Sequence, residues 1–347
     1  LSRNGGPEQS GEPGRPRVCH TGPSRQGKAP MYRKLTTVVV IGATTLLAAC
    51  GDDASDTAVT TPATSPDTTP DTTPDPTPDT EPAADAPQAI LSMSPTHTEM
   101  LFALGAGDQV IAVDNFSNYP PEAADLMVGL DAYQPSVEAI AGLEPDLVVV
   151  QGGYDDLVGQ LTDLGIDTWV GEAPADLDGV YTQVEQLGAR VGRVGEAAEL
   201  VLDMSTRVDA AIAALPAVDE PLTYYHELDN TYFSVTSASF IGAVYAELGL
   251  VNIADAAGVD NPYPQLSAEF IIDADPDLIF LADTKYSEES AATVAARPGW
   301  DTIAAVANGG VVELDDDVAS RWGPRIADYI EQVGAAVAAV GALQAAG

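Results

Sequence analysis

Cysteine and histidine are scarce in this chain of 347 residues, which holds two cysteines and three histidines. Cys19 and Cys50 both precede the folded body predicted below, and only His97 and His226 follow Cys50. A body without thiols cannot have a disulfide framework or a cysteine nucleophile. A zinc-type site also needs several converging histidine, cysteine or carboxylate ligands. We therefore expect no metal site and no cofactor.

Basic residues are equally rare: 14 Lys and Arg stand against 53 Asp and Glu, which gives a formal net charge of −39. Seven of the 14 lie before Cys50, and none lies between Gly51 and Ala189. Such a surface repels phosphate backbones, which argues against nucleic-acid binding. It suits a partner with positive patches, because long-range fields steer encounter. Solubility or a halophilic habit explains the same composition, and both explanations stay open.

The sequence motifs of common enzyme families are also missing. No stretch reads G-x-x-x-x-G-K-[ST] or G-x-S-x-G, and no G-x-G-x-x-G follows a predicted strand. His97 with Glu99, or His226 with Glu227, could form an acid–base pair. The second pair is disfavoured because adjacent strand residues point to opposite faces. We predict that the protein is not an enzyme; a structural or adhesive surface lipoprotein is the other alternative.

The amino-terminal segments follow the order of a bacterial lipoprotein. Residues 1–30 are rich in Gly, Pro and Arg and contain no Met. We interpret them as non-native upstream sequence, and their detection on the cellular protein by intact mass would contradict this. Residues 31–49 have a basic start, an apolar run shorter than the roughly 20 residues of a membrane span, and small residues at the end. The ending before Cys50 is similar to a lipobox, which predicts an extracytoplasmic protein anchored to the membrane by a lipidated Cys50.

Residues 50–87 are predicted to be a tether. After Cys50 the segment repeats Pro, Asp and Thr, a composition that cannot build a core and should stay extended. In polyproline II form, at about 3.1 Å per residue, it would reach roughly 115 Å. A stalk that crosses a cell-wall layer and a merely tolerated linker are both compatible with this pattern.

From residue 88 onward, short apolar runs alternate with helical patterns, which predicts α/β lobes with mostly parallel sheets. We expect strands at 89–93, 110–113, 146–150, 168–170 and 222–228. A long helical pattern ends at Pro216, and a final helix is expected from 324 to about 340. The body therefore divides into an amino-terminal lobe (88–193), an interlobe helix (194–216) and a carboxy-terminal lobe (217–347), both lobes being Rossmann-like.

An internal repeat supports two lobes of like construction. Residues 137–150 match residues 268–281 at a constant offset of 131, with Glu, Ile, Pro, Asp and Leu kept. Each copy predicts a short helix, a Pro-Asp turn and a buried strand.

Five further motifs stand in order along the body: 90–99 continued by 104–107, then 119–122, 144–148, 297–300 and 320–325. With them, the span from about Gln88 to Val340 resembles the iron-siderophore and vitamin B12 substrate-binding proteins of ABC importers. The resemblance implies two α/β lobes joined by one rigid interlobe helix, with limited closure on the ligand. It also implies a monomer whose partners are an ABC permease and its ATPase.

The resemblance assigns permease docking to one surface glutamate per lobe, here Glu138 and Glu269. These are the two acids that the internal repeat pairs. Two separated carboxylates on one face would fix orientation on a roughly two-fold permease through charge-assisted pairs. The alternative is that both are ordinary acids in the first turn of a helix.

The ligand is expected in the cleft between the lobes, at loops that follow the strands. By matched position, the candidate contacts are His97, Phe116, Tyr119, Tyr133, Tyr154, Tyr225, His226, Tyr232, Arg321 and Trp322. Aromatic faces suit a large, flat or amphipathic ligand. Anionic siderophores need several cations, and only Arg321 and Lys285 are plausible here. This favours cobalamin or another corrinoid, or a neutral or hydroxamate ferric siderophore. The alternative is a heme- or metal-binding lipoprotein of the same fold, with heme held by Tyr or His; a zinc-type site is disfavoured by the scarcity of histidine.

Overall fold

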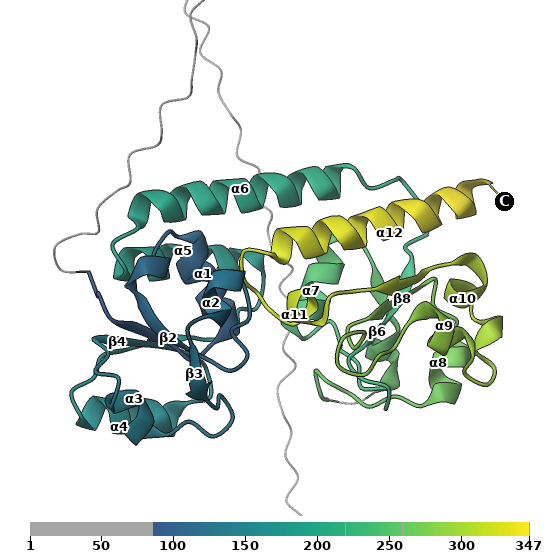
Figure 1. Cartoon of the computed structure of the whole chain (residues 1–347). Coiled ribbons are helices and arrows are strands. Elements are labelled where there is room, and N and C mark those ends of the chain that lie inside the picture. The colour runs from purple at the N-terminus through teal and green to yellow at the C-terminus, as the bar shows by residue number, and fades with distance from the viewer. Residues whose placement is uncertain (1–85, 219, 259, 347) are drawn as a thin grey trace, which may run out of the picture. The chain divides into compact units, whose positions relative to one another are not determined.

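The computed structural model describes residues 86–218, 220–258 and 260–346 (Figure 1). The expectations for residues 1–85, including the upstream segment, the signal peptide, Cys50 and nearly all of the tether, lie outside this part. In these three ranges no helix has both the length and the apolar character needed to cross a membrane.

The amino-terminal lobe is built on a parallel five-stranded sheet in the order β3-β2-β1-β4-β5. Its strands are β1 (Ile90–Ser92), β2 (Val110–Asp114), β3 (Met127–Leu130), β4 (Leu147–Gln151) and β5 (Thr168–Gly171). Its helices are α1 (Pro95–Ala103), α2 (Pro121–Ala124), α3 (Val137–Ala141), α4 (Asp155–Asp163) and α5 (Leu177–Arg190), with a 3₁₀ turn η1 (Gly107–Gln109). Helices α1 and α5 cover one face of the sheet, and α3 and α4 cover the other (Figure 1).

The first four residues of strand β4 are all apolar, and their packing shows why. Leu147 and Val149 pack in the cluster that holds the buried residues of α1 and α5, whereas Val148 and Val150 pack in the cluster that holds those of α3 and α4. All four side chains are fully buried. A parallel strand that is covered on both faces has no polar side to present to water, so its sequence is a continuous apolar run.

The carboxy-terminal lobe has a parallel four-stranded sheet in the order β7-β6-β8-β9. Its strands are β6 (Thr223–Glu227), β7 (Val251–Asn252), β8 (Leu278–Leu281) and β9 (Val311–Glu313). Its helices are α7 (Phe240–Glu247), α8 (Ala268–Ala274), α9 (Ala291–Ala295), α10 (Ala304–Asn308), α11 (Asp316–Ala319) and α12 (Ile326–Ala346), with 3₁₀ turns η2 (Ile253–Ala257) and η3 (Trp300–Thr302). The prediction of α/β lobes with parallel sheets is confirmed.

The internal repeat of the sequence is a repeated unit of structure. Helices α3 and α8 are the equivalent helices, and β4 and β8 are the strands that follow them. Ser136 and Ser267 cap these helices by accepting hydrogen bonds from backbone amides three residues on. In the turns, Glu144 and Asp275 both adopt positive φ, at 52° and 46°. Residues that lie 131 positions apart in the sequence therefore form the same helix cap and the same turn in the two lobes.

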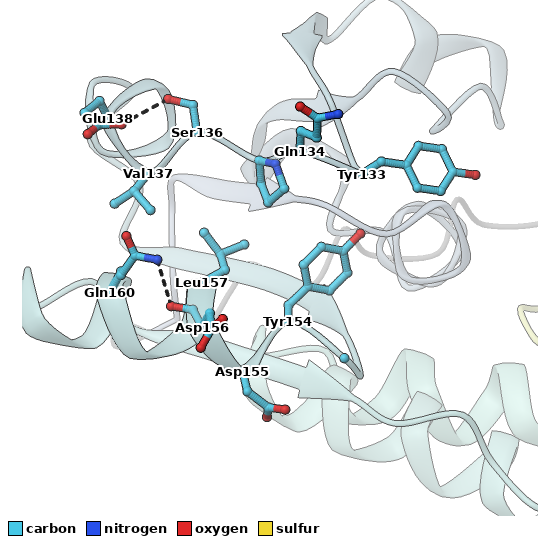
Figure 2. A pocket seen from close by; sticks show the side chains of 12 residues that line it. Tyr133, Gln134, Ser136, Val137, Glu138, Tyr154, Asp155, Asp156, Leu157 and Gln160 are labelled. Atoms are coloured by element: carbon cyan, nitrogen blue, oxygen red, sulfur yellow. Dashed lines mark hydrogen bonds between the residues drawn. The ribbon is translucent and has the colours of Figure 1, made fainter. Parts of the chain in front are cut away.

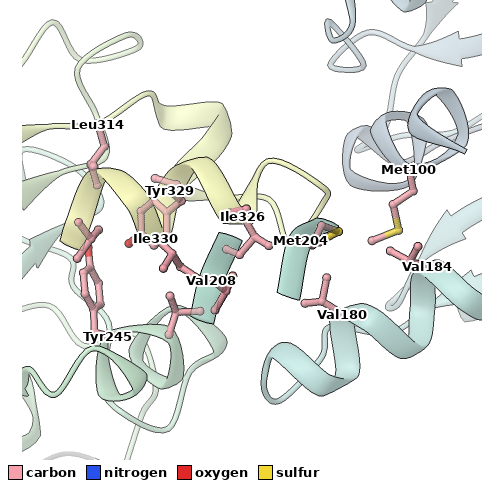
Figure 3. Packing of buried hydrophobic residues seen from close by; sticks show 14 of the residues in the cluster. Met100, Val180, Val184, Met204, Val208, Tyr245, Leu314, Ile326, Tyr329 and Ile330 are labelled. Atoms are coloured by element: carbon pink, nitrogen blue, oxygen red, sulfur yellow. The ribbon is translucent and has the colours of Figure 1, made fainter. Parts of the chain in front are cut away.

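Helix α6 (Val194–Ala213) and helix α12 pack against each other and run along both lobes (Figure 1). Figure 3 shows Met204 of α6 between Met100 of the amino-terminal lobe and Ile326 of α12. These residues belong to one buried cluster that continues to Tyr245 and Tyr329 of the carboxy-terminal lobe. A wide hinge motion would open this shared core and expose apolar surface, which costs about 25 cal/mol per Å². Limited closure therefore stays our prediction, and the shared core supports it.

Candidate ligand-binding cleft

A cavity of about 460 Å³ lies between the two lobes. Its walls come from the segments that follow β1 to β4 and from the loops around α11. The lining residues are Met93, Pro95, Thr96, Phe116, Ala132, Tyr133, Gln151 and Tyr154 from the amino-terminal lobe, and Tyr286, Asp317, Ser320, Arg321 and Trp322 from the carboxy-terminal lobe. The carboxyl ends of parallel strands form such crevices in α/β proteins. The cavity is the size of a small-molecule site.

Five of the thirteen residues that line the cavity are aromatic: Phe116, Tyr133, Tyr154, Tyr286 and Trp322. Phe116 and Tyr133 meet edge to face at 5.3 Å between ring centroids. Tyr133 is 81% exposed and Tyr286 is 66% exposed, so both rings are open to a ligand. Tyr154 donates its hydroxyl hydrogen to the carbonyl of Ala132 at 2.5 Å, which ties the loop that carries Tyr133 to the start of α4. Flat apolar faces held in this way suit a large planar or amphipathic ligand.

The loop that carries Phe116 is positioned by a buried acid at the end of β2. Asp114 accepts hydrogen bonds from the Phe116 amide at 2.6 Å and from the Ser117 hydroxyl at 2.8 Å. Burial raises the pKa of Asp114, and these hydrogen bonds and the charge of Arg321 act in the opposite direction. Asp114 thereby presents the Phe116 ring to the cleft.

Arg321, which lines the cavity, and Lys285 beside it are both paired with acids, although the Lys285 side chain is 44% exposed and is not part of the lining. Arg321, only 9% exposed, donates to Glu99 at 2.9 Å and to Asp317 at 2.8 Å. The Lys285 ammonium forms an ion pair with Asp317. The hydrogen bond to Asp317 raises the pKa of Lys285, so that the ammonium stays charged and paired. A ligand in this cavity meets tyrosine and phenylalanine rings but no unpaired cation among the described residues.

Polar contacts across the cleft join the two lobes beside the cavity. Arg325 donates to both carboxylate oxygens of Glu99, at 2.6 and 2.8 Å. Asn118 donates to Asp317 at 2.9 Å, and the Trp322 indole donates to Gln183 at 3.2 Å. The loop between α11 and α12 is therefore fastened to the amino-terminal lobe.

A second cavity, of about 590 Å³, adjoins the first on the amino-terminal lobe and shares Tyr133 and Tyr154 with it. In Figure 2, these two tyrosines lie at one end of this cavity and Glu138 lies at the other. The rest of its lining is mostly polar and includes Gln134 and Gln160. A ligand larger than the central cavity has room to extend past the tyrosines.

Five of the ten predicted contacts line the central cavity: Phe116, Tyr133, Tyr154, Arg321 and Trp322. Tyr119 lies instead in a separate cavity of about 450 Å³, where Arg325 stacks over its ring at 4.1 Å. The tyrosine stands outside the cleft because the chain has already turned into α2 at Pro121.

The remaining four predicted contacts are placed away from the cavity. His97 is fully buried, with Nδ1 2.7 Å from the Ser94 hydroxyl and Nε2 3.1 Å from Gln183, and burial lowers its pKa to about 4. Tyr225 and His226 are fully buried because β6 continues through both and is covered on both faces. Tyr232 stacks on Trp300 at 5.9 Å. In this conformation a ligand in the cavity cannot touch these four side chains.

The structure adds Tyr286 and Asp317 to the candidate site, which the sequence did not indicate. A signal was present in the run Asp315-Asp316-Asp317, which ends four residues before Arg321. Acidic residues so close in sequence to Arg321 predict that its guanidinium group forms ion pairs within the protein. Glu138 and Glu269 are both exposed, in the first turns of α3 and α8. No group of three or more potential metal ligands converges anywhere in the described ranges.

A buried carboxylate, Asp283, precedes the loop that carries Lys285 and Tyr286. It is 2% exposed, and neither of its oxygens has a hydrogen-bond partner among the described residues. Its pKa is raised to about 7, chiefly by burial and also by the charges of Glu227 and Glu289, against the opposing charge of Arg297.

We expect this acid to make the protein less stable as the pH rises from about 4 to about 7. In that interval the folded protein keeps the Asp283 proton while the unfolded chain has released it, so increasing pH favours unfolding. Above about pH 7 both states are ionised and the slope ends. Asp283→Asn should raise the unfolding free energy at pH 8 by about 1–3 kcal/mol, with a smaller gain at pH 5. Urea unfolding at both pH values measures this, with the exposed Asp301→Asn as control; an equal gain at both pH values would contradict it.

The fold and the cleft define a two-lobed substrate-binding protein, and comparison with known proteins identifies the family. Residues 90–318 match the periplasmic binding protein family, so the chain belongs to that family. It is 30% identical over 249 residues to a cobalamin-binding protein of Halobacterium salinarum, across 70% of this chain and 67% of the relative. The protein is thus an extracytoplasmic binding protein and not an enzyme, as the sequence predicts.

Two solved structures show the same fold. The periplasmic vitamin B12-binding protein of Vibrio cholerae is 26% identical with a TM-score of 0.62, over 73% of this chain and 97% of that chain. A periplasmic heme-binding protein of a Roseiflexus species is 23% identical with a TM-score of 0.66, over 73% and 99%. The resemblance to the iron-siderophore and vitamin B12 binding proteins is confirmed.

Proposed function

We propose that this protein is the substrate-binding subunit of an ABC importer and that its ligand is cobalamin or another corrinoid. The observation that carries the proposal is a cleft lined by aromatic rings in which Arg321 and Lys285 are both paired with acids. Such a cleft offers flat apolar contact and, among the residues that the structure describes, no unpaired positive charge. A macrocycle with uncharged amide substituents fits it, whereas an anionic catecholate or carboxylate siderophore does not. A neutral hydroxamate siderophore satisfies the same charge requirement.

The size of the site is compatible with such a ligand. A whole corrinoid is larger than the central cavity of about 460 Å³, so part of it would extend beyond the cavity. The adjoining cavity lies past Tyr133 and offers the side-chain amides of Gln134 and Gln160. Amide groups both donate and accept hydrogen bonds, so they match the amide substituents of a corrinoid. The names of the Halobacterium and Vibrio relatives support the same choice.

The proposal includes the anchor and the partners. Cys50 would hold the protein at the membrane through its lipid, residues 51–87 would act as the stalk, and a permease with its ATPase would receive the ligand from the monomer. The lipobox-like sequence before Cys50 supports the anchor. The intact mass of the membrane-associated protein tests it, because a lipidated chain must begin at Cys50 and carry the added acyl groups.

A ligand screen tests the proposed function. The chain from Gly51 onward is mixed with cyanocobalamin, cobinamide, heme, a neutral ferric hydroxamate and an anionic ferric catecholate. A ligand present at 100 times its Kd stabilises the folded state by about 2.7 kcal/mol, so a corrinoid should raise the melting temperature clearly. We expect this for the corrinoids and not for the catecholate. No shift with either corrinoid would overturn the proposed ligand.

One observation favours heme as the second candidate. Tyrosine oxygen can ligate heme iron, and the Tyr133 hydroxyl is exposed with no partner among the described residues, whereas those of Tyr154 and Tyr286 bond to Ala132 and Asp317. A heme-dependent absorbance change that Tyr133→Phe removes would favour heme. The two propionates of heme would meet no free cation in the described cleft, which is why we place it second.

A further inference from the structure

We propose that Asp317 sets the charge selectivity of the cleft: by pairing with its basic groups, it excludes anionic ligands. The inference relies on the proposed function only in taking the interlobe cavity as the ligand site. It assigns to one residue the discrimination between neutral and anionic ligands.

Asp317 is placed and bonded as a charge-neutralising group. It lines the cavity, yet it is only 7% exposed. One of its oxygens accepts hydrogen bonds from Arg321 at 2.8 Å and from the Tyr286 hydroxyl at 3.1 Å. The other accepts from Asn118 at 2.9 Å and from the Lys285 ammonium. A single carboxylate thus pairs both with Arg321 of the cavity wall and with Lys285, which precedes the wall residue Tyr286.

The protonation state of Asp317 is consistent with this role. Burial alone would raise its pKa, but the hydrogen bonds from Lys285 and Asn118 and the charge of Arg321 outweigh burial and lower it. The carboxylate therefore stays ionised at neutral pH.

Asp317 is the acid that Arg321 and Lys285 share. Lys285 has its ion pair with Asp317, and Arg321 pairs with Asp317 and Glu99. The other buried acids nearby have partners of their own: Glu99 also pairs with Arg325, Asp316 accepts hydrogen bonds from the backbone amides of Lys285 and Tyr286, and Asp114 accepts from Phe116 and Ser117. Loss of the Asp317 charge would therefore leave Lys285 without its ion-pair partner and Arg321 with one fewer. That positive charge would attract a carboxylate, a sulfonate or a phosphate.

Asp317→Asn separates charge from structure, because asparagine keeps the shape and one acceptor oxygen. The binding assay uses the chain from Gly51 onward with two matched probes, cyanocobalamin and its monocarboxylate, in which one amide is replaced by a carboxylate. A third probe, the anionic aromatic dye anilinonaphthalene sulfonate, does not depend on the identity of the natural ligand. We expect Asp317→Asn to bind the monocarboxylate and the dye about tenfold more tightly and cyanocobalamin about equally. The gain should shrink as salt increases.

Three further variants serve as controls for this binding assay. Asp301→Asn removes the same charge from an exposed position in η3 and should leave all three affinities unchanged. Asp317→Asn with Lys285→Met should lose much of the gain, because the released cation is gone. Ser320→Lys adds a cation at an exposed position of the cavity wall and should also favour the anionic probes, even if Asp317→Asn does not fold.

The outcomes distinguish the two proposals. If no corrinoid binds either protein, the proposed ligand is wrong, and the dye still decides the role of Asp317. A loss of affinity for neutral and anionic probes alike in Asp317→Asn would show a merely structural residue and overturn the inference. Equal binding of anionic probes by wild type, Asp317→Asn and Ser320→Lys would also overturn it.

Discussion

Cells that carry the double variant Glu138→Ala/Glu269→Ala should lose uptake of labelled cobalamin, while the purified variant binds cobalamin as tightly as the wild type. Both glutamates are exposed, and each stands in the first turn of a helix, α3 in one lobe and α8 in the other. These helices lie on the side of the body away from α6 and α12 (Figure 1). Neither glutamate lines the central cavity; Glu138 lines the adjoining cavity at the end away from Tyr133 and Tyr154 (Figure 2), so its loss leaves the aromatic contacts to the ligand in place.

The physical reason for a large effect is that two separated carboxylates fix orientation where one cannot. Charge-assisted hydrogen bonds to permease arginines would hold each lobe in place. Without both carboxylates, the cleft would no longer be aligned with the entrance of the transport pathway. Each single variant should keep part of the uptake, because the remaining pair still brings the two proteins together. Glu138 already accepts a hydrogen bond from its own cap residue Ser136 at 3.3 Å, which is weak enough to exchange for a partner.

Glu185→Ala/Glu199→Ala is the matched control. It removes two exposed acids from α5 and α6, on the opposite side of the body, and changes the net charge by the same amount. Uptake should be unchanged in this control. If the two double variants reduce uptake equally, the effect is one of general charge; if Glu138→Ala/Glu269→Ala imports cobalamin normally, the docking assignment is wrong.

The features that could be predicted from the sequence are those that local pattern determines. The four residues Leu147–Val150 of β4 and the four residues of β8 are all apolar because both faces of these strands are covered. The internal repeat shows from the sequence alone that the two strands are equivalent. Strand β3 was not expected. Its four residues include Gly129 at φ 82°, and the strand is partly exposed, so the sequence there has no continuous apolar run.

The candidate site was harder to predict because a matched position does not determine exposure. His226 stands near the end of a strand in the sequence, where cleft residues often lie, but β6 extends through Glu227 and buries it. The interactions that decide the charge of the cleft join distant segments: Glu99 and Arg321 are 222 residues apart, and Asn118 and Asp317 are 199 apart. No local pattern signals such pairs.

Glu99→Ala is expected to lower the free energy of unfolding by about 3–5 kcal/mol, the range for removing one partner of a buried ion pair. Glu99 is 3% exposed and accepts from Arg321 at 2.9 Å and from Arg325 at 2.6 and 2.8 Å. Its loss leaves two largely buried guanidinium groups with less charge compensation, at the point where α1 meets the start of α12. For a body held by one shared core, that decrease is a large fraction of the total stability.

Denaturant unfolding measures the change, with the exposed Glu122→Ala as a control that should shift stability by less than about 0.5 kcal/mol. A decrease below about 1 kcal/mol in Glu99→Ala would contradict the prediction.

The double variant Glu99→Ala/Arg325→Ala shows whether the loss of stability in Glu99→Ala comes from a buried guanidinium group that has lost its carboxylate partner. Arg325 also stacks over Tyr119 at 4.1 Å, so its removal alone loses that contact as well as the ion pair. If the stranded charge dominates, removing Arg325 from the Glu99→Ala background should restore part of the stability, because one uncompensated cation disappears. If packing dominates, the two losses should add. The sign of this coupling therefore decides whether Glu99 acts chiefly as a counter-charge for the arginines or as a packing element between the lobes.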